Sequence, residues 1–234
     1  MIIQIYEIQD PKEAEELIRM GVDHIGSVVL EKESWKQENI KTVVNICKEA
    51  GKKSSLIFLF QDMEVIKKAI EYYQPDIIHF CEDITAETEK HIERQIVVKE
   101  LFPELILMRS IPVPPKGNNW LLSLEKLKPF EPYTDIFLID TYVNKAPVNG
   151  YVGITGKTCD WDLAKMLVNE LNRPVILGGG LNPSNVYEAI LTVKPDGVDS
   201  CTGTNAVDAS GRPIRFKKDM NKVKSFIEEC RRYE

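Results

Sequence analysis

The sequence predicts an α/β protein that folds as a single (β/α)8 barrel, the TIM barrel architecture. Short runs rich in aliphatic residues alternate with longer segments whose apolar residues recur at helical spacing, and there are eight of each. The 234 residues give about 29 residues per strand–helix unit, the usual size of such a unit. The strand-like runs are apolar almost throughout, as in parallel sheets covered by helices. A flavodoxin-like sheet would need only five strands, so the eight units favour the barrel.

Eight short runs are expected to be strands, because branched aliphatic and aromatic side chains dominate them. In order, they cover residues 2–6, 24–30, 54–60, 76–80, 105–111, 135–140, 174–177 and 197–200. The segments that follow are expected to be helices and cover residues 11–21, 39–50, 62–73, 85–101, 118–127, 160–171, 183–193 and 217–232. Boundary signals support them: Pro11 fits a first helical turn, Asp62 fits an N-cap, and Gly21 fits a helix end.

Composition and charge limit the class of protein. The chain has 30 Lys and Arg against 36 Asp and Glu, and its formal net charge of −6 argues against a nucleic-acid partner. It lacks a run of about 18 apolar residues and a secretory signal, so we expect a cytoplasmic protein that does not span a membrane. Five cysteines without a CxxC pair predict no metal site and no disulfide framework. No linker divides residues 1–234, so we expect one domain, as a monomer or a homodimer.

Two turns rich in glycine and hydroxyl groups follow the seventh and eighth expected strands. These turns form the usual phosphate site of a (β/α)8 barrel, at the face where its active sites lie. Glycine lets backbone N–H groups approach an anion closely, although the glycines could also serve only to make tight turns. We expect a phosphate to be bound by Gly178, Gly179, Gly180, Thr202, Gly203 and Thr204.

Three other residues near strand ends carry side chains suited to chemistry. Asp140 ends the sixth strand, where partial burial raises the pKa of a carboxyl group toward the range of acid–base catalysis; the alternative is a helix cap or a surface position. Arg109 could hold a carboxylate or a phosphate, unless it pairs with Asp140 or Glu7. His79 has the chemistry of a catalyst but is more often a hydrogen-bonded core residue.

The loop after the sixth strand contains the run Gly-Ile-Thr-Gly-Lys-Thr at residues 153–158. A nucleotide-binding loop has a glycine five positions before the glycine of its Gly-Lys pair. Here that position, just before the run, is Tyr151, so we reject that interpretation. We expect a glycine-hinged lid over the barrel mouth, with a plain flexible connection as the alternative.

Four segments of the second half carry a more specific signal. They are Leu-Ile-Asp-Thr-Tyr at 138–142, Thr-Gly-Lys-Thr-Cys-Asp-Trp at 155–161, Pro-Val-Ile-Leu-Gly-Gly-Gly-Leu-Asn-Pro-Ser-Asn-Val at 174–186 and Lys-Pro-Asp-Gly-Val-Asp at 194–199. Their order and spacing resemble the phosphoribosylanthranilate isomerase family. The resemblance implies a (β/α)8 barrel of tryptophan biosynthesis that uses no cofactor. Its reaction is the Amadori rearrangement of an N-linked phosphoribosyl aminoaldose to an aminoketose.

The resemblance also implies roles for single residues. Asp140 matches the family's general acid, and the glycine-rich turns match its phosphate site. The family's base is a cysteine at the end of the first strand, where this chain has Tyr6 followed by Glu7, so we expect a substitute base at Glu7 or Tyr6. Lys36 stands in place of a substrate-contacting arginine, which keeps the charge but loses the bidentate geometry. Arg109 and His79 complete the expected substrate contacts.

Three functions are compatible with this pattern. The first is a phosphoribosylanthranilate isomerase-like enzyme with Asp140 as acid and a substitute base near Glu7. The second is a paralogue that isomerises another sugar phosphate, and the third is a non-catalytic protein that binds a phosphorylated metabolite. In each case the expected partner is a small phosphorylated sugar.

Overall fold

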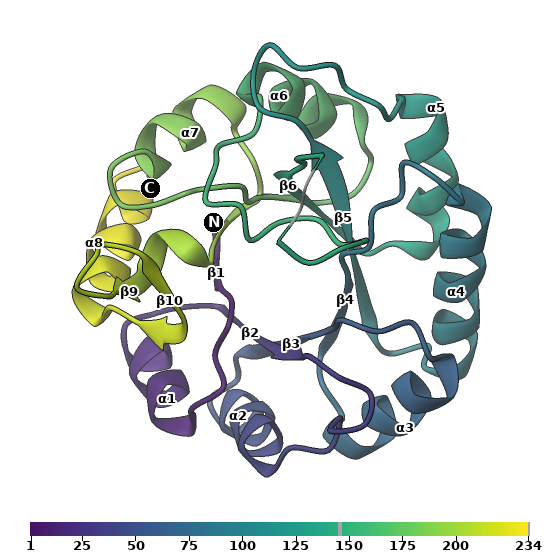
Figure 1. The fold of residues 1–234 in the computed structure, drawn as a ribbon, viewed down its shortest axis with the longest axis horizontal. Coiled ribbons are helices and arrows are strands. Elements are labelled where there is room, and N and C mark those ends of the chain that lie inside the picture. Colours follow the sequence, from purple (N-terminus) through teal and green to yellow (C-terminus); the bar gives the residue numbers. More distant parts are fainter. Residues whose placement is uncertain (145–146, 234) are drawn as a thin grey trace.

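The structure, a computed structural model, describes residues 1–144 and 147–233. Within these residues, eight parallel strands close into a barrel in their order along the chain (Figure 1). The first strand pairs with the second on one side and with the eighth on the other, with Ile2 opposite Gly197. The strands are β1 (Ile2–Ile5), β2 (His24–Val29), β3 (Lys53–Phe58), β4 (Ile77–Phe80), β5 (Ile106–Val113), β6 (Ile136–Thr141), β7 (Val175–Leu177) and β8 (Gly197–Ser200). The predicted (β/α)8 barrel is confirmed.

Helices surround this barrel on all sides (Figure 1). They are α1 (Pro11–Arg19), α2 (Glu38–Glu49), α3 (Met63–Tyr73), α4 (Thr88–Leu101), α5 (Leu124–Leu127), α6 (Trp161–Glu170), α7 (Val186–Val193) and α8 (Met220–Arg231). Aspartates at the N-caps of α1, α3, α6 and α8 accept hydrogen bonds from the first helical N–H groups, which fixes where these helices begin. Among the described residues, no helix has the length and apolar character needed to cross a membrane.

Strand side chains alternate between the barrel interior and the layer under the helices. Val28, Ile77, Met108 and Leu138 belong to one buried cluster that fills the barrel. Neighbouring residues such as Leu107 pack in separate clusters with the helices. This alternation decides which side chains at the strand ends can face the barrel mouth.

The prediction of a helix over residues 118–127 is wrong for most of that segment. The α-helix there is only Leu124–Leu127, and a 3-10 helix, η1 (Lys128–Tyr133), continues it. Two prolines, at 129 and 132, limit the hydrogen bonding of this segment. Trp120 instead donates its indole N–H to the Pro112 carbonyl (3.1 Å), which ties the preceding loop to β5.

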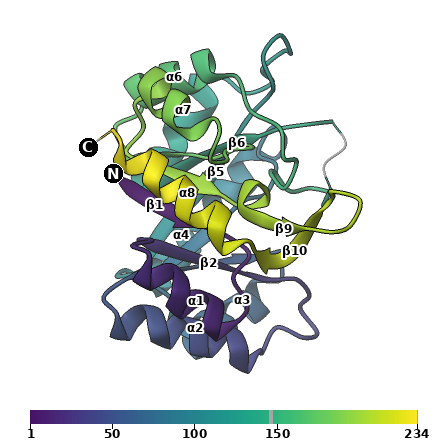
Figure 2. The same cartoon turned by 90° about the vertical axis from the view of Figure 1, so that its left-hand side faces the viewer.

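A hairpin that the sequence analysis did not predict lies between β8 and α8. After the 3-10 turn η2 (Thr202–Thr204), β9 (Asn205–Val207) pairs antiparallel with β10 (Pro213–Lys218). The last helix therefore begins at Met220 and not at residue 217. The hairpin extends from the same end of the barrel as the loop that follows β6 (Figure 2).

Candidate active site

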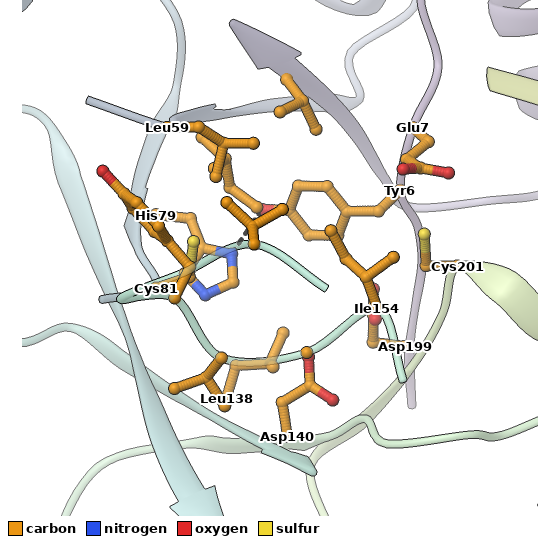
Figure 3. A pocket seen from close by; sticks show the side chains of 16 residues that line it. Tyr6, Glu7, Leu59, His79, Cys81, Leu138, Asp140, Ile154, Asp199 and Cys201 are labelled. Atoms are coloured by element: carbon orange, nitrogen blue, oxygen red, sulfur yellow. Dashed lines mark hydrogen bonds between the residues drawn. The ribbon is translucent and has the colours of Figure 1, made fainter. Parts of the chain in front are cut away.

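A small cavity lies at the C-terminal ends of the strands, where Tyr6, His79, Asp140 and Asp199 converge (Figure 3). Its remaining walls come from strand ends and from the loop after β6, and they are mostly apolar. They comprise Glu7, Val28, Ile57, Leu59, Cys81, Leu138, Val148, Tyr151, Val152, Gly153, Ile154 and Cys201. The free volume is about 50 Å³, enough for only a few water molecules.

The loop after β6 covers this cavity. A Cβ atom at Gly153 would lie 2.2 Å from Asp140 Oδ2, so the loop backbone rests directly on the carboxyl group. Gly150 and Gly153 have positive φ angles of 81° and 99°, and so does the β-branched Ile154 at 59°, a conformation that costs energy. The described part of this loop therefore forms one wall of the cavity, at the place where the sequence analysis expects a glycine-hinged lid.

Two carboxyl groups, those of Asp140 and Asp199, line this cavity. Asp199 extends from β8, is 6% exposed and accepts a hydrogen bond from Gln4 Nε2 (3.1 Å). Desolvation, together with the charge of Asp140, raises the pKa of Asp199 to about 7. Desolvation also raises the pKa of Asp140 to about 6, against the lowering effect of the Thr141 N–H bonded to its Oδ1 at 2.7 Å. Both groups can therefore exchange protons near neutral pH.

A second, more polar cavity continues from the first toward the ends of β7 and β8. The two share Asp140, Ile154, Asp199 and Cys201. The second is lined further by Thr155, Gly156, Gly179, Gly180, Leu181, Thr202 and Gly203. These residues bring together the two turns that the sequence suggested as a phosphate site.

The geometry of Gly179 and Gly180 suits an anion. Their φ angles are +78° and +64°, and within the described part of the chain their N–H groups donate no hydrogen bond. A Cβ at Gly180 would lie 2.5 Å from the Lys157 carbonyl carbon, so close packing also requires a glycine there. Behind the neighbouring turn, the buried Lys218 donates from Nζ to the Cys201 carbonyl (2.9 Å), and burial lowers the pKa of its ammonium group.

Two of the expected phosphate residues lie elsewhere. The Gly178 N–H donates to the Ile139 carbonyl (2.8 Å) and continues the pairing of β6 with β7. Thr204 is fully buried, and its hydroxyl donates to the Cys201 carbonyl (3.1 Å). Both are internal parts of the turns and do not line the second cavity.

Tyr6 and His79 belong to a chain of hydrogen bonds across the barrel interior. The Tyr6 hydroxyl lies 2.6 Å from Ser55 Oγ and 2.8 Å from His79 Nδ1, and His79 Nε2 lies 2.7 Å from Ser110 Oγ. Burial raises the pKa of Tyr6 well above its usual range and lowers that of His79 to about 3. Both side chains are therefore neutral near pH 7, and their polar atoms have partners inside the barrel.

Glu7 reaches only the rim of the cavity. Its side chain points away from the centre in Figure 3, toward the β9–β10 hairpin. There Glu7 Oε1 accepts from Arg215 Nε (2.6 Å) and Oε2 accepts from Asn205 Nδ2 (3.3 Å). Both carboxylate oxygens are therefore bonded to the hairpin, and the Glu7 carboxylate also accepts a hydrogen bond from the thiol of Cys201 at the edge of the cavity.

Arg109 is not a residue of the mouth. It is fully buried on the helix-facing side of β5, since its neighbours Met108 and Ser110 occupy the interior. Arg109 Nη1 donates to Glu82 Oε2 (2.8 Å), and Nε donates to Gln95 Oε1 (2.7 Å). Arg109 therefore pairs with Glu82, and not with Asp140 or Glu7 as the sequence analysis considered, and its contacts join β4, β5 and α4.

Lys36 does not line the cavity either. It is exposed, and its Nζ lies 4.7 Å from the ring centroid of Tyr72 on α3. This cation–π contact holds the loop after β2 against the outer helices. The positive charge of Lys36, which the sequence analysis expected near the substrate, therefore lies on the outside of the barrel.

The cysteines of the cavity do not supply a base. Cys81 and Cys201 both line it as free thiols, but burial raises the pKa of each well above its usual range. The sequence analysis missed Asp199. The signal was present: an acidic residue inside the eighth strand, on the same face as Cys201 by the alternation of side chains.

Comparison with known proteins shows the family and agrees with the fold. The family model described as N-(5'phosphoribosyl)anthranilate (PRA) isomerase matches residues 3–229. The N-(5'-phosphoribosyl)anthranilate isomerase of Methanosarcina acetivorans is 28% identical, covering 98% of this chain and 92% of that one. The enzyme of that name from Caldanaerobacter subterraneus is 32% identical, covering 89% and 87%. Among solved structures, phosphoribosyl anthranilate isomerase from Thermotoga maritima superposes with a TM-score of 0.69 at 24% identity over 99% of both chains, which supports the fold.

Proposed function

The chain belongs to the N-(5'-phosphoribosyl)anthranilate isomerase family, and we propose that it catalyses an Amadori isomerisation of an N-linked phosphoribosylamine. The observation that carries this proposal is the pair Asp140 and Asp199, which lines both the main cavity and the glycine-rich turn beside it. The reaction needs an acid and a base on one sugar ring, with a phosphate held at a fixed distance. This arrangement of residues provides all three.

Asp140 is the proposed acid. Its carboxyl group donates a proton to the ring oxygen, the bond between that oxygen and C1 breaks, and the nitrogen lone pair forms a C1=N iminium. Desolvation favours the protonated form of Asp140, since it raises the pKa to about 6. The lid over Asp140 excludes water while the iminium exists.

Asp199 is the proposed base, in place of the Glu7 suggested by the sequence. Its carboxylate removes the proton from C2, and the electrons of that C–H bond form C1=C2 as the iminium electrons return to nitrogen. Tautomerisation of the enolamine then gives the aminoketose, with no atom gained or lost. A pKa of about 7 makes Asp199 the stronger base of the two carboxylates, whereas both oxygens of Glu7 are bonded to the hairpin.

The phosphate is proposed to bind in the second cavity. The free N–H groups of Gly179 and Gly180 and the hydroxyl of Thr202 line that space, and the charge of Lys218 favours an anion from behind the turn. A sugar ring attached to this phosphate then lies between Asp140 and Asp199, because both cavities share these residues.

The test is a continuous assay of phosphoribosylarylamine consumption, with the labile substrates formed in situ from ribose 5-phosphate and either anthranilate or aniline. We expect wild-type protein to consume at least one of them. Asp140→Asn and Asp199→Asn should each lower kcat by about 10²–10⁴-fold, the usual contribution of one acid or base.

Glu7→Gln is the matched comparison, because it removes a neighbouring carboxylate that faces the hairpin. Full loss of turnover in Glu7→Gln with an active Asp199→Asn would return the base to Glu7. Absence of turnover of both substrates by folded wild-type protein would contradict the proposed activity itself.

A further inference from the structure

The main cavity extends beyond the two aspartates, away from the glycine-rich turns, into a region that we call the apolar lobe. Its walls are the side chains of Val28, Ile57, Leu59, Cys81, Leu138 and Val148. Leu59, Cys81 and Leu138 lie together on one side of Figure 3, and Asp199 and Cys201 lie on the other. The second cavity, at the glycine-rich turns, has no such apolar region, because its walls are mainly glycine and threonine.

The position of the lobe relative to the aspartates assigns it a part of the substrate. If the proposed function holds, the phosphate occupies the glycine-rich turns and the sugar lies at Asp140 and Asp199. The nitrogen is attached at C1, at the opposite end of the sugar from the 5-phosphate. The nitrogen substituent must therefore enter the apolar lobe.

Within residues 1–144 and 147–233, the charges that line the cavity disfavour a carboxylate on that substituent. Among the described residues that line the cavity, none is lysine or arginine, and the carboxyl groups of Asp140 and Asp199 lie in it. A carboxylate placed there would be buried without a cation and close to like charges, which is strongly unfavourable. His79 cannot serve as the cation, because burial lowers its pKa to about 3.

The lysine and arginine residues that lie closest along the chain to the residues of the barrel mouth have other partners. Arg109 is paired with the buried Glu82, which Arg94 also approaches at 3.7 Å. Lys36 lies on the Tyr72 ring, and Arg215 is bonded to Glu7 at 2.6 Å. Releasing Arg109 would leave Glu82 buried, and releasing Arg215 would leave Glu7 buried, so neither moves cheaply toward a ligand.

From this geometry we infer that the native substrate carries an uncharged, apolar nitrogen substituent, such as an aryl or alkyl amine without a carboxylate. This inference rests on the proposed function for the placement of the sugar and phosphate. It distinguishes this chain from an enzyme that requires an ortho-carboxylated ring in the lobe.

The first test measures binding and needs no turnover. The probes are two stable reduced products, 1-phenylamino-1-deoxy-pentitol 5-phosphate and its 2-carboxyphenyl counterpart, titrated calorimetrically into the full chain. We expect the phenyl compound to bind at least about 10-fold more tightly, the factor that 1.4 kcal/mol represents. Equal or tighter binding of the carboxyphenyl compound, or binding of neither, would overturn the inference.

Charge variants of the lobe sharpen this test. Leu59→Arg places a cation in the lobe, and Leu59→Gln is a matched control of similar polarity without charge. Leu59→Arg should raise the affinity for the carboxyphenyl compound relative to the phenyl compound at least about 10-fold, and Leu59→Gln should not. An unaltered preference in folded Leu59→Arg would show that the nitrogen substituent does not occupy the lobe.

Turnover separates this inference from the proposed function. We expect a higher kcat/KM for the aniline-derived substrate than for the anthranilate-derived one. A preference for the anthranilate-derived substrate would overturn the inference and leave the isomerase activity standing. Tight binding of the phenyl product analogue without turnover of either substrate would contradict the isomerase activity, while supporting an apolar ligand.

Discussion

The two sides of the barrel mouth differ in what their polar residues do. On the β6–β8 side, Asp140 and Asp199 have raised pKa values, and Gly179 and Gly180 leave backbone N–H groups free. On the β1–β5 side, the main polar groups already have protein partners: Tyr6 and His79 bond within the barrel, and Arg109 is paired with Glu82 beneath the helices, although its Nη2 has no hydrogen-bond partner among the described residues. The first set is held in an unfavourable state that a ligand can relieve, and the second set stabilises the fold.

This contrast explains how one side can resemble the isomerase family closely while the other departs from it. The proposed acid–base chemistry and phosphate binding use the β6–β8 side, and there the sequence motifs match. The proposed recognition of the nitrogen substituent uses the β1–β5 side, where Tyr6 and apolar side chains line the cavity in this chain. Variants on the β1–β5 side should therefore cost stability, and variants on the β6–β8 side should cost activity.

The largest expected effect is a loss of stability caused by a variant on the β1–β5 side. Arg109→Met leaves Glu82 buried without its main partner, and we expect a loss of about 3–5 kcal/mol in the free energy of unfolding. Chemical denaturation measures this loss. The double variant Arg109→Met/Glu82→Gln should recover part of it, because no unpaired charge remains. A variant that folds as stably as wild type but fails to turn over substrate would instead place Arg109 in catalysis and break the comparison.

Asp199→Asn should show the opposite pattern, with lower activity and higher stability. The folded pKa is about 7, above the unfolded value of about 3.9, so the penalty of ionising Asp199 grows as pH rises from 4 to 7 and persists above 7. At 1.36 kcal/mol per pKa unit, removing this charge should stabilise the protein by on the order of 2–4 kcal/mol at pH 8 and hardly at all at pH 4.

Asp76→Asn is the control for this linkage. Hydrogen bonds from Ser54 and Lys53 hold the pKa of Asp76 below its usual value, so its contribution to stability is present above that value and lost in acid. The variant should therefore be destabilised at pH 8, the reverse of Asp199→Asn. Destabilisation of both variants at pH 8 would refute the prediction that the ionised Asp199 carboxylate destabilises the folded protein.

The barrel could be predicted from the sequence because eight apolar runs and their helix caps are local signals. The orientation of single side chains at the strand ends could not. Arg109 was placed in the mouth because it follows an apolar run, but Ser110 reaches His79 and so Arg109 must face the helices. Lys36 and Glu7 bind Tyr72 and Arg215, partners 36 and 208 positions away, which no local pattern indicates.

Gly180→Ala tests the β6–β8 side through its backbone. The new Cβ would lie 2.5 Å from the Lys157 carbonyl carbon, at a φ of +64°, so the turn must shift. We expect kcat/KM to fall by about 100-fold, the effect of a displacement near 1 Å, which corresponds to about 2.7 kcal/mol. Gly211→Ala at a φ of +80° in the hairpin has open space around its Cβ, so it carries the same backbone strain but should keep its kcat/KM. Similar losses in both variants would mean that strain alone, and not the phosphate turn, controls activity.

The smallest expected effect decides whether Tyr6 has a chemical role. Tyr6→Phe removes a hydroxyl that lies within hydrogen-bond distance of Ser55 Oγ and His79 Nδ1, and leaves both of these buried groups without that partner. The cost should be about 1–3 kcal/mol of stability, measured by denaturation, because unsatisfied buried polar groups carry that penalty. Most of the turnover should remain, since the pKa of Tyr6 is raised by burial and its hydroxyl points to the barrel interior. A stable Tyr6→Phe protein without turnover would give the phenol a direct part in proton transfer, and the β1–β5 side would then share in the chemistry.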